Sequence, residues 1–392
     1  MAEDTVYERL IEHQQGWVFG MPEHEALLHL LKMYFTPEEA ALCARIPHLP
    51  KTAEELSGLL RIPVDELIRK LDDFSRRGII QRSQGRDAIR YALMDAVFWF
   101  YRASGWAGRT GKWNRDISTL LNRYYIDSFA DAFVGLHTKG LRAIPIGETV
   151  TDTHVVLPYE DIVQIIDQVS YYTVSVCPCR HRKNLDPDSH SCSHETLNCL
   201  HFDRLGHYIV ENDMGKEITR EETLEILASA ADAGLVHGIS NTKTKMDTIC
   251  NCCSCCCLFL ESTVNMAEPV PRGHQPSNYI VHIQKEVCKA CGLCARRCPM
   301  GALKLKDTDT SAAIISKGMD NSTELERKGK DLVFNPERCL GCGVCVHKCT
   351  GGALSLIQRD EEHDIPISLA DQGQRMMMEQ GLDPMDVFQR NS

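Results

Sequence analysis

The sequence lacks the features of a membrane or secreted protein. It has no uninterrupted apolar run of about 20 residues, the length that a helix needs to span a bilayer. Residues 1–5 are acidic and lack the basic start and apolar core of a signal peptide. We therefore expect a cytoplasmic protein without a membrane span, whose cysteines stay reduced.

Several cofactor motifs are also absent. There is no C-x3-C-x2-C of the radical-SAM type, no G-x4-G-K-S/T, no G-x-G-x-x-G after a strand, and no C-x-x-C-H. The sequence thus gives no support for radical-SAM chemistry, for ATP hydrolysis or for Rossmann-type nicotinamide or flavin binding. A c-type haem site is absent as well.

The chain has no excess of basic charge. Its formal net charge is −11 at pH 7, which argues against DNA or RNA as its main partner. A local basic face remains compatible with this value.

Cysteine, in contrast, is abundant, with 19 residues in a chain of 392. Disulfide-stapled secreted proteins are usually short, so in a chain of this length we expect the thiols to bind metal. Six cysteines fall within eight residues: Cys250, Cys252, Cys253, Cys255, Cys256 and Cys257. Adjacent side chains cannot all face one core on a helix or a strand, so burial alone does not explain this run. Dense thiolates suit zinc, copper(I) or iron–sulfur clusters.

A cysteine repeat lies closer to the C-terminus. The spacing C-x2-C-x2-C-x3-C occurs at Cys288, Cys291, Cys294 and Cys298 and again at Cys339, Cys342, Cys345 and Cys349. Each copy is followed by G-A-L-x-L. Zinc fingers have no need to repeat the third and fourth cysteines, whereas this spacing suits a pair of [4Fe–4S] clusters.

This region resembles a bacterial-type two-cluster ferredoxin. The resemblance implies that one cluster is held by Cys288, Cys291, Cys294 and Cys349, and the other by Cys339, Cys342, Cys345 and Cys298. One departure is Thr350, at a position where the family usually has proline. The change removes a rigid turn but no ligand.

A second set of cysteines lies upstream, at Cys177, Cys179, Cys192 and Cys199. We expect these four to share metal with the run and to hold at least one additional Fe–S cluster, with structural zinc as the alternative. Arg180 and His181 adjoin the C-x-C pair and could tune a cluster by hydrogen bonding. Cys43 stands alone and suits a small buried position.

The N-terminal part is predicted to be helical. Capping boxes at Thr36 and Thr52 begin two helices, residues 64–77 form an amphipathic third, and residues 79–93 form a hairpin. This order resembles a winged helix-turn-helix. It could contact DNA through seven basic residues: Arg69, Lys70, Arg76, Arg77, Arg82, Arg86 and Arg90. Acidic residues on the same helix favour a protein-docking role instead.

We therefore expect a multidomain α+β protein. Its predicted parts are a winged-helix-like domain (1–95), an aromatic-rich helical bridge (96–160), a central Cys-rich α/β metal-binding region (161–270), a dicluster ferredoxin domain (278–358) and a tail (359–392). The polar segment 307–330 between the two repeats is predicted to be an inserted loop. As a whole, the order resembles a family of largely uncharacterised 4Fe-4S proteins of anaerobic bacteria, which implies redox work in an anoxic cytoplasm.

Three functions follow from these features, and the sequence does not decide whether the protein is an enzyme. The first is electron transfer to a redox partner, such as a flavoprotein or an oxidoreductase subunit, in a homo- or hetero-oligomer. The second is a reductase that binds its substrate at the upstream cluster. The third is a redox-sensing winged-helix regulator, which rests on fold analogy.

Overall fold

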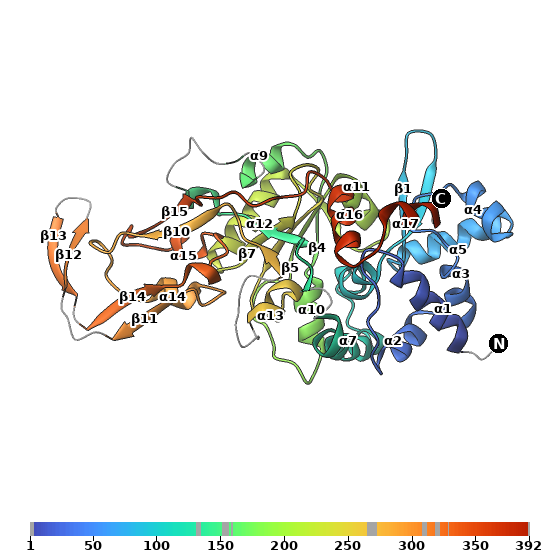
Figure 1. The fold of residues 1–392 in the computed structure, drawn as a ribbon, viewed down its shortest axis with the longest axis horizontal. Helices are drawn as coiled ribbons and strands as arrows, with labels where there is room; N and C mark the ends of the chain where they lie inside the picture. Colours follow the sequence, from blue (N-terminus) through green and yellow to red (C-terminus); the bar gives the residue numbers. More distant parts are fainter. Residues whose placement is uncertain are drawn as a thin grey trace. The chain divides into compact units, whose positions relative to one another are not determined.

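The computed structural model describes residues 4–130, 135–150, 157, 160–264, 273–307, 312–317, 322–327 and 329–390. These residues form two compact units that alternate along the chain. Unit 1 comprises Met1–Thr138, Tyr171–Thr219 and Leu369–Ser392, and unit 2 comprises Lys139–Ser170 and Arg220–Ser368. Both contain helices and strands (Figure 1), as expected for an α+β protein. The predicted domain boundaries stay a prediction.

Unit 1 begins with five helices and a hairpin. They are α1 (Asp4–Gln15), α2 (Leu27–Tyr34), α3 (Pro37–Cys43), α4 (Ala53–Leu60), α5 (Val64–Arg76), β1 (Ile80–Gln84) and β2 (Ile89–Leu93). The predicted capping boxes are confirmed. The side chains of Thr36 and Thr52 each accept the backbone N–H of the glutamate three residues later, whose carboxylate accepts the backbone N–H of the threonine. The predicted amphipathic helix and hairpin are also confirmed. The winged-helix assignment itself stays a prediction.

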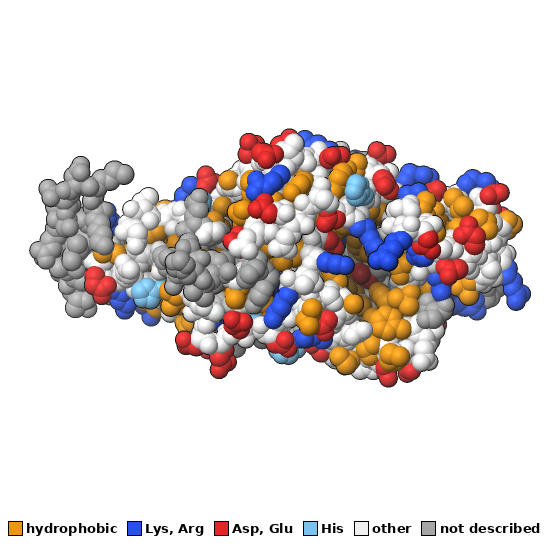
Figure 2. Space-filling view, turned by 90° about the horizontal axis from the view of Figure 1, so that it is seen from above, with side chains coloured by type: hydrophobic (Ala, Val, Ile, Leu, Met, Phe, Trp, Pro, Cys, Tyr) orange, Lys and Arg blue, Asp and Glu red, His pale blue; other side chains and the backbone are white. Residues whose placement is uncertain are grey.

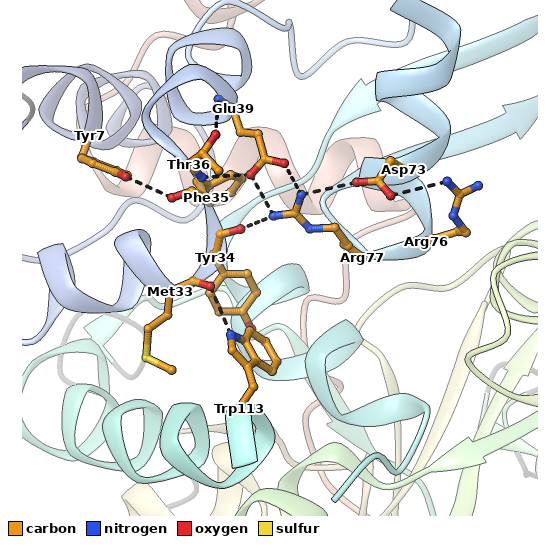
Figure 3. A network of polar contacts seen from close by, with 10 residues as sticks. All are labelled: Tyr7, Met33, Tyr34, Phe35, Thr36, Glu39, Asp73, Arg76, Arg77 and Trp113. Atoms are coloured by element: carbon orange, nitrogen blue, oxygen red, sulfur yellow. Dashed lines mark hydrogen bonds and ion pairs between the residues drawn. The ribbon is translucent and has the colours of Figure 1, made fainter. Parts of the chain in front are cut away.

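Arg77 fixes the packing of this helical part. It follows α5 and donates to Glu39 on α3 at 2.6 Å, while another guanidinium nitrogen bonds the carbonyl oxygen of Tyr34 (Figure 3). Glu39 also accepts the backbone N–H of Thr36 at 2.9 Å, so one carboxylate caps α3 and pairs with Arg77. The ends of α2, α3 and α5 therefore meet at a single guanidinium group.

The rest of unit 1 consists of aromatic-rich helices and three paired strands. The helical elements are η1 (Val97–Ala103), α6 (Ser104–Trp106), α7 (Lys112–Tyr124), η2 (Tyr125–Phe129), α10 (Pro178–Leu185), α11 (Asp203–Glu211), α16 (Leu369–Glu379) and α17 (Pro384–Arg390). The strand β4 (Tyr172–Val176) pairs antiparallel with β5 (Leu197–Phe202) and with β6 (Lys216–Ile218). Aromatic rings such as Trp99, Trp106 and Tyr124 are buried.

Unit 2 is built on a second group of strands. The central strand β7 (Val236–Ser240) pairs antiparallel with β3 (Leu141–Ala143) and with β8 (Thr248–Cys252). β9 (His274–Gln275) runs parallel to β3. The helical elements here are η3 (Gly147–Thr149), α9 (Ile162–Asp167), α12 (Arg220–Asp232) and α13 (Leu258–Val264).

The C-terminal part of unit 2 is made of paired strands and short helices. The antiparallel pairs are β10 (Tyr279–Ile283) with β15 (Leu354–Gln358), β11 (Leu303–Asp307) with β14 (Lys330–Phe334), and β12 (Ala312–Lys317) with β13 (Ser322–Arg327). The helical elements are α14 (Leu293–Arg297), η5 (Pro336–Arg338) and α15 (Val344–His347).

The prediction that 307–330 is a loop was wrong, because the segment contains β12 and β13. Its charged residues suggested a loop, but Ala312–Lys317 contains a short run of apolar residues with two β-branched isoleucines, which suits a strand. The sequence also predicts a strand with turns at 149–158 and a Pro-rich linker containing Pro269, Pro271 and Pro276. Most of residues 149–158, as well as Pro269 and Pro271, lie outside the described residues.

A fully buried ion pair anchors the ferredoxin-like strands to β3. Nη1 of Arg142 donates to Oε1 of Glu160 at 2.9 Å, and neither side chain is exposed. The same carboxylate accepts the backbone N–H of Asn278, which immediately precedes β10, at 3.2 Å. Burial raises the pKa of Glu160, and the charge of Arg142 opposes that rise.

Removing one charge of this pair should destabilise unit 2. Glu160→Gln removes the carboxylate charge that pairs with the buried Arg142 guanidinium, and breaking a buried ion pair typically costs about 3–5 kcal/mol. Asp167→Asn is the matched control, because Asp167 forms a 2.6 Å pair with Arg220 at the surface and should cost less than about 1 kcal/mol. Hydrogen exchange of β3 and β10 amides measures both; equal effects would contradict the structural role of the buried pair.

Candidate metal centres

The two cysteine repeats lie in loops framed by the paired strands of unit 2. The first loop follows β10 and contains α14, and the second precedes β15 and contains α15. Both loops place left-handed residues at the same two positions: Ala290 (φ 48°) and Gly292 (φ 74°) in the first, Gly341 (φ 69°) and Gly343 (φ 76°) in the second. The backbone thus makes the same turn around the second cysteine of each repeat.

At Gly341 the turn leaves no space for a side chain. A Cβ atom there would lie 2.2 Å from the carbonyl oxygen of Tyr279 on β10. Glycine therefore lets the second loop approach the strand closely.

The structure gathers four thiols at the first repeat. The thiols of Cys288, Cys291 and Cys349 all act on that of Cys294. Burial, reinforced by these neighbours, raises the pKa of Cys294 to about 11. The fourth member comes from the second repeat, as the ferredoxin resemblance implied.

A second group gathers around Cys342. Burial, together with the neighbouring thiols of Cys298 and Cys339, raises its pKa to about 12. The same neighbours act on Cys345, whose pKa burial raises well above its ordinary value. All four cysteines line one hollow together with apolar residues such as Met300 and Leu340. The donor set fits an iron–sulfur cluster.

The cysteine run begins on β8. Side chains alternate across a strand, so Cys250 and Cys252 share one face and Asn251 lies on the other. Asn251 Oδ1 bonds Nδ1 of His237 on β7 at 2.7 Å. The strand therefore turns two thiols of the run in the same direction.

After β8 the chain turns, with the backbone N–H of Cys257 bonded to the carbonyl oxygen of Cys253 at 3.1 Å. This turn divides the run into two groups of thiols. In the first, Cys252 contacts Cys250 and Cys257, and these neighbours together with burial raise its pKa well above the ordinary value. In the second, Cys256 contacts Cys253 and Cys255, with 3.7 Å between the sulfurs of Cys255 and Cys256.

The first group shares an apolar core with the second ferredoxin loop. Cys252 and Cys257 pack in one buried cluster with Met300, Leu340 and Cys342. Cys250 and Cys298 contact the same cluster from its border. Thus Cys252 and Cys257 of the run pack with Cys342 of the second quartet in one interior within unit 2.

The remaining candidate cysteines belong to unit 1. Cys177 precedes α10, and its pKa is raised well above the ordinary value by the neighbouring Cys179 thiol and by burial. Cys192 is buried, and Asn184 holds its backbone through bonds of 2.7 and 3.3 Å. Cys199 is buried on β5 opposite Ser175. Metal sharing between these four and the run stays a proposal.

Arg180 and His181 have partners of their own. Arg180 is fully buried and donates to the carbonyl oxygen of Glu195 and to Oδ1 of Asn198, the latter at 2.9 Å. Its charge also favours the thiolate of Cys177. His181 bonds the carbonyl oxygen of Arg109 at 2.8 Å. Of the two, Arg180 is the one that acts on a candidate ligand.

Sequence reasoning missed His274. A nitrogen of its imidazole and the sulfurs of Cys252 and Cys257 all lie within 4.8 Å of one another, and all three residues are buried. His274 follows Cys257 by 17 positions, outside any metal-binding spacing considered above. Only the pairing of β9 with β3 brings it to the cysteines.

The raised thiol pKa values predict that the metal-free protein loses stability in alkali. The pKa values of Cys294 and Cys342 rise from 9.0 to about 11 and 12. The folded chain thus holds these protons more tightly than the unfolded chain. The stability that these two protonated thiols contribute is fully present below pH 9. It is lost as the pH rises through their pKa values in the folded state, about 11 and 12. Thermal unfolding from pH 8 to 11 should show a falling midpoint.

Metal-loaded protein should lack this fall, because its thiolates are already deprotonated and coordinated. Metal-free Cys342→Ser should show a shallower decline than metal-free wild type. Parallel declines of the loaded and metal-free proteins would contradict this assignment of the thiols.

Comparison with known proteins identifies the C-terminal region. Residues 280–361 match the family of 4Fe-4S dicluster domains. The chain is 37% identical over 90 residues to the pyruvate-flavodoxin oxidoreductase of Rhodospirillum rubrum, covering 20% of this chain and 7% of that protein. It is 30% identical over 103 residues to the polyferredoxin protein MvhB of Methanothermus fervidus, covering 22% and 25%.

A ferredoxin-3 of Nostoc is 34% identical over 67 residues, or 17% of this chain and 66% of that protein. This chain therefore spans only a small part of the first two relatives. No solved structure matches it. None of the helices in the described residues has the length and apolarity to cross a membrane. Residues 280–361 are thus a 4Fe-4S dicluster domain, and the similarity to ferredoxins supports iron–sulfur electron transfer.

Proposed function

We propose that this protein passes electrons between two [4Fe–4S] clusters in its dicluster domain, a further Fe–S cluster on the cysteine run and a redox partner protein. Cluster one is held by Cys288, Cys291, Cys294 and Cys349, and cluster two by Cys339, Cys342, Cys345 and Cys298. The grouping of the thiols around Cys294 and around Cys342 supports this division. When bound, the clusters supply one-electron chemistry, and the chain provides thiolates and an apolar surround.

The observation that carries the proposal is the shared core of the run and the second quartet. Cys252, Cys257 and Cys342 pack in one apolar cluster. Electron transfer weakens steeply with distance and is favoured through packed protein rather than through water. An electron on cluster two thus has a route through the interior of unit 2 to Cys252 and Cys257, which adjoin Cys253 and Cys256 of the further cluster in the sequence.

The further cluster is assigned to Cys253, Cys255 and Cys256. Their sulfurs lie within 4.8 Å of one another, and the set offers thiolates without a competing nitrogen. Such soft donors suit iron–sulfur chemistry. We assign its fourth ligand to the upstream set Cys177, Cys179, Cys192 and Cys199, of which Cys192 is tested first because Asn184 already holds its loop.

We infer that the N-terminal domain docks a protein rather than DNA. Of the seven basic residues that could contact phosphate, five form ion pairs: Lys70, Arg76, Arg77, Arg82 and Arg90. A DNA phosphate would have to displace these carboxylates. On the face in Figure 2, acidic and basic side chains of the described residues are interspersed. Such mixed charge is compatible with a protein partner.

The partner that we propose is a flavoprotein or another oxidoreductase subunit. One relative is named as an oxidoreductase that acts with flavodoxin, and another as a polyferredoxin. Both similarities are confined to about a fifth of this chain. The partner is therefore proposed from the shared type of domain.

Iron content tests the additional cluster. Two cubanes need roughly eight iron atoms per chain, and a further cluster should raise iron and acid-labile sulfide above this amount. Double substitution Cys253→Ser/Cys256→Ser should bring iron back to roughly eight and leave the dicluster EPR signals unchanged. Cys192→Ser should have the same effect when Cys192 is the fourth ligand.

Cys43→Ser is the matched control, because Cys43 is as buried as Cys256 but lies in the N-terminal helical part. It should change neither iron content nor the EPR spectrum. Wild-type protein that holds only about eight iron atoms would contradict the further cluster, whereas loss of dicluster signals in Cys291→Ser would still support the ferredoxin assignment.

A further inference from the structure

The half of the cysteine run on β8 has a donor set different from the other half. It contains Cys252, Cys257 and the imidazole of His274, whose donor atoms lie within 4.8 Å of one another, and Cys250, which contacts Cys252. The second half, Cys253, Cys255 and Cys256, contains thiols alone. The two groups therefore present different chemistry to a metal, although they are interleaved in the sequence.

Four strands bring the first group together within unit 2. Cys250 and Cys252 lie on one face of β8, and His274 lies on β9, at the other end of the order β8, β7, β3, β9. Cys257 follows the turn that begins after β8. Backbone hydrogen bonds connect β8 to β7, β7 to β3, and β3 to β9, so the backbone fixes the relative positions of the donors on β8 and β9.

Gly238 leaves the space that this arrangement requires. It lies on β7, opposite Cys250 in the strand register. A Cβ atom at position 238 would lie 2.9 Å from Nε2 of His274 and 3.7 Å from the sulfur of Cys252. The ring of Phe259 meets the His274 imidazole edge-on, with 5.5 Å between ring centres. The imidazole is thus held beside the thiols by packing on both sides.

We propose that Cys250, Cys252, Cys257 and His274 bind a single zinc ion, separate from the iron–sulfur clusters. Zinc binds thiolate at about 2.3 Å and imidazole nitrogen at about 2.0–2.1 Å in a tetrahedral shell. Two donors of one ion then lie roughly 3.5–3.8 Å apart, which agrees with three donors inside 4.8 Å. In a [4Fe–4S] cubane each thiolate instead binds a different iron, so the ligands surround a larger group. The close approach of His274 to Gly238 leaves little space for a group of that size.

The burial of the site favours a structural ion. Cys252, Cys257 and His274 are all buried, and four protein donors complete the shell of a structural zinc without an open position. The ion would join β8, β9 and the turn at Cys257. Because this group packs with Cys342 in one apolar cluster, it would also fix the run against the second ferredoxin loop.

Zinc analysis and X-ray absorption of the anaerobically purified full-length protein test this directly. We expect about one zinc per chain in a shell of three sulfurs and one nitrogen. His274→Ala should lose the zinc, and His274→Cys should keep it while converting the shell to four sulfurs. Absence of zinc, or a wild-type shell without nitrogen, would overturn the proposal.

Gly238→Ala tests the site without removing a donor. The added methyl group should push His274 away and weaken zinc binding roughly 10–100-fold in a chelator competition, the range expected for a residue that supports a ligand. Gly147→Ala is the matched control, because a Cβ there meets no atom within 4 Å, and it should leave the affinity unchanged. Equal affinities in the Gly238→Ala and wild-type proteins would contradict the proposed role of His274.

The zinc site and the electron-transfer proposal can fail independently. If the protein holds about one zinc, which His274→Ala loses, and only about eight iron atoms, the zinc proposal is supported and the additional cluster is contradicted. About two zinc ions per chain with the same iron content would mean that both halves of the run bind single ions, which also keeps this site. Iron well above eight atoms without zinc would remove the zinc site alone.

Discussion

The crowding of thiols in unit 2 is the constraint on which the rest of the structure depends. Around Cys252, Cys256 and Cys342, burial and neighbouring thiols all raise the pKa, so deprotonated sulfurs at these distances would repel one another in an apolar interior. A bound metal resolves this conflict, because it pairs each thiolate with positive charge. We therefore expect the folding of unit 2 to be coupled to metal binding, with these sulfurs protonated in a chain without metal.

Strand pairing and tight turns serve this gathering of donors. In the two ferredoxin loops, left-handed residues at matching positions curve the chain around its cysteines, and β10 and β15 close the frame. In the run, alternation on β8 followed by the turn at Cys253 separates six thiols into two groups. The buried pair of Arg142 and Glu160 then joins β3 to the segment that begins β10. The run and the dicluster domain consequently share one core.

The sequence predicted what depends on local spacing. The capping boxes at Thr36 and Thr52, the helix α5 and the hairpin after it follow from short motifs. The grouping of Cys349 with the first repeat was implied by the resemblance to ferredoxins, and as a ligand set it stays a prediction. The sequence did not predict what depends on long-range pairing. His274 reaches Cys252 only through the order of four strands, and the division of the run into two groups depends on where β8 ends. The strands β12 and β13 were missed because the many charged residues of that segment suggested a loop, although it contains a short run of apolar residues.

The central claim is that electrons pass from the dicluster domain to the cysteine run through the core around Cys342. Freeze-quench EPR after addition of less than one equivalent of reductant tests it most directly. In the wild-type protein, the signal of the reduced dicluster should give way to a signal that Cys253→Ser/Cys256→Ser removes. In Cys342→Ser, which keeps all four cysteines of the first quartet, that second signal should appear far more slowly. A second signal that forms at the wild-type rate in Cys342→Ser would contradict the account.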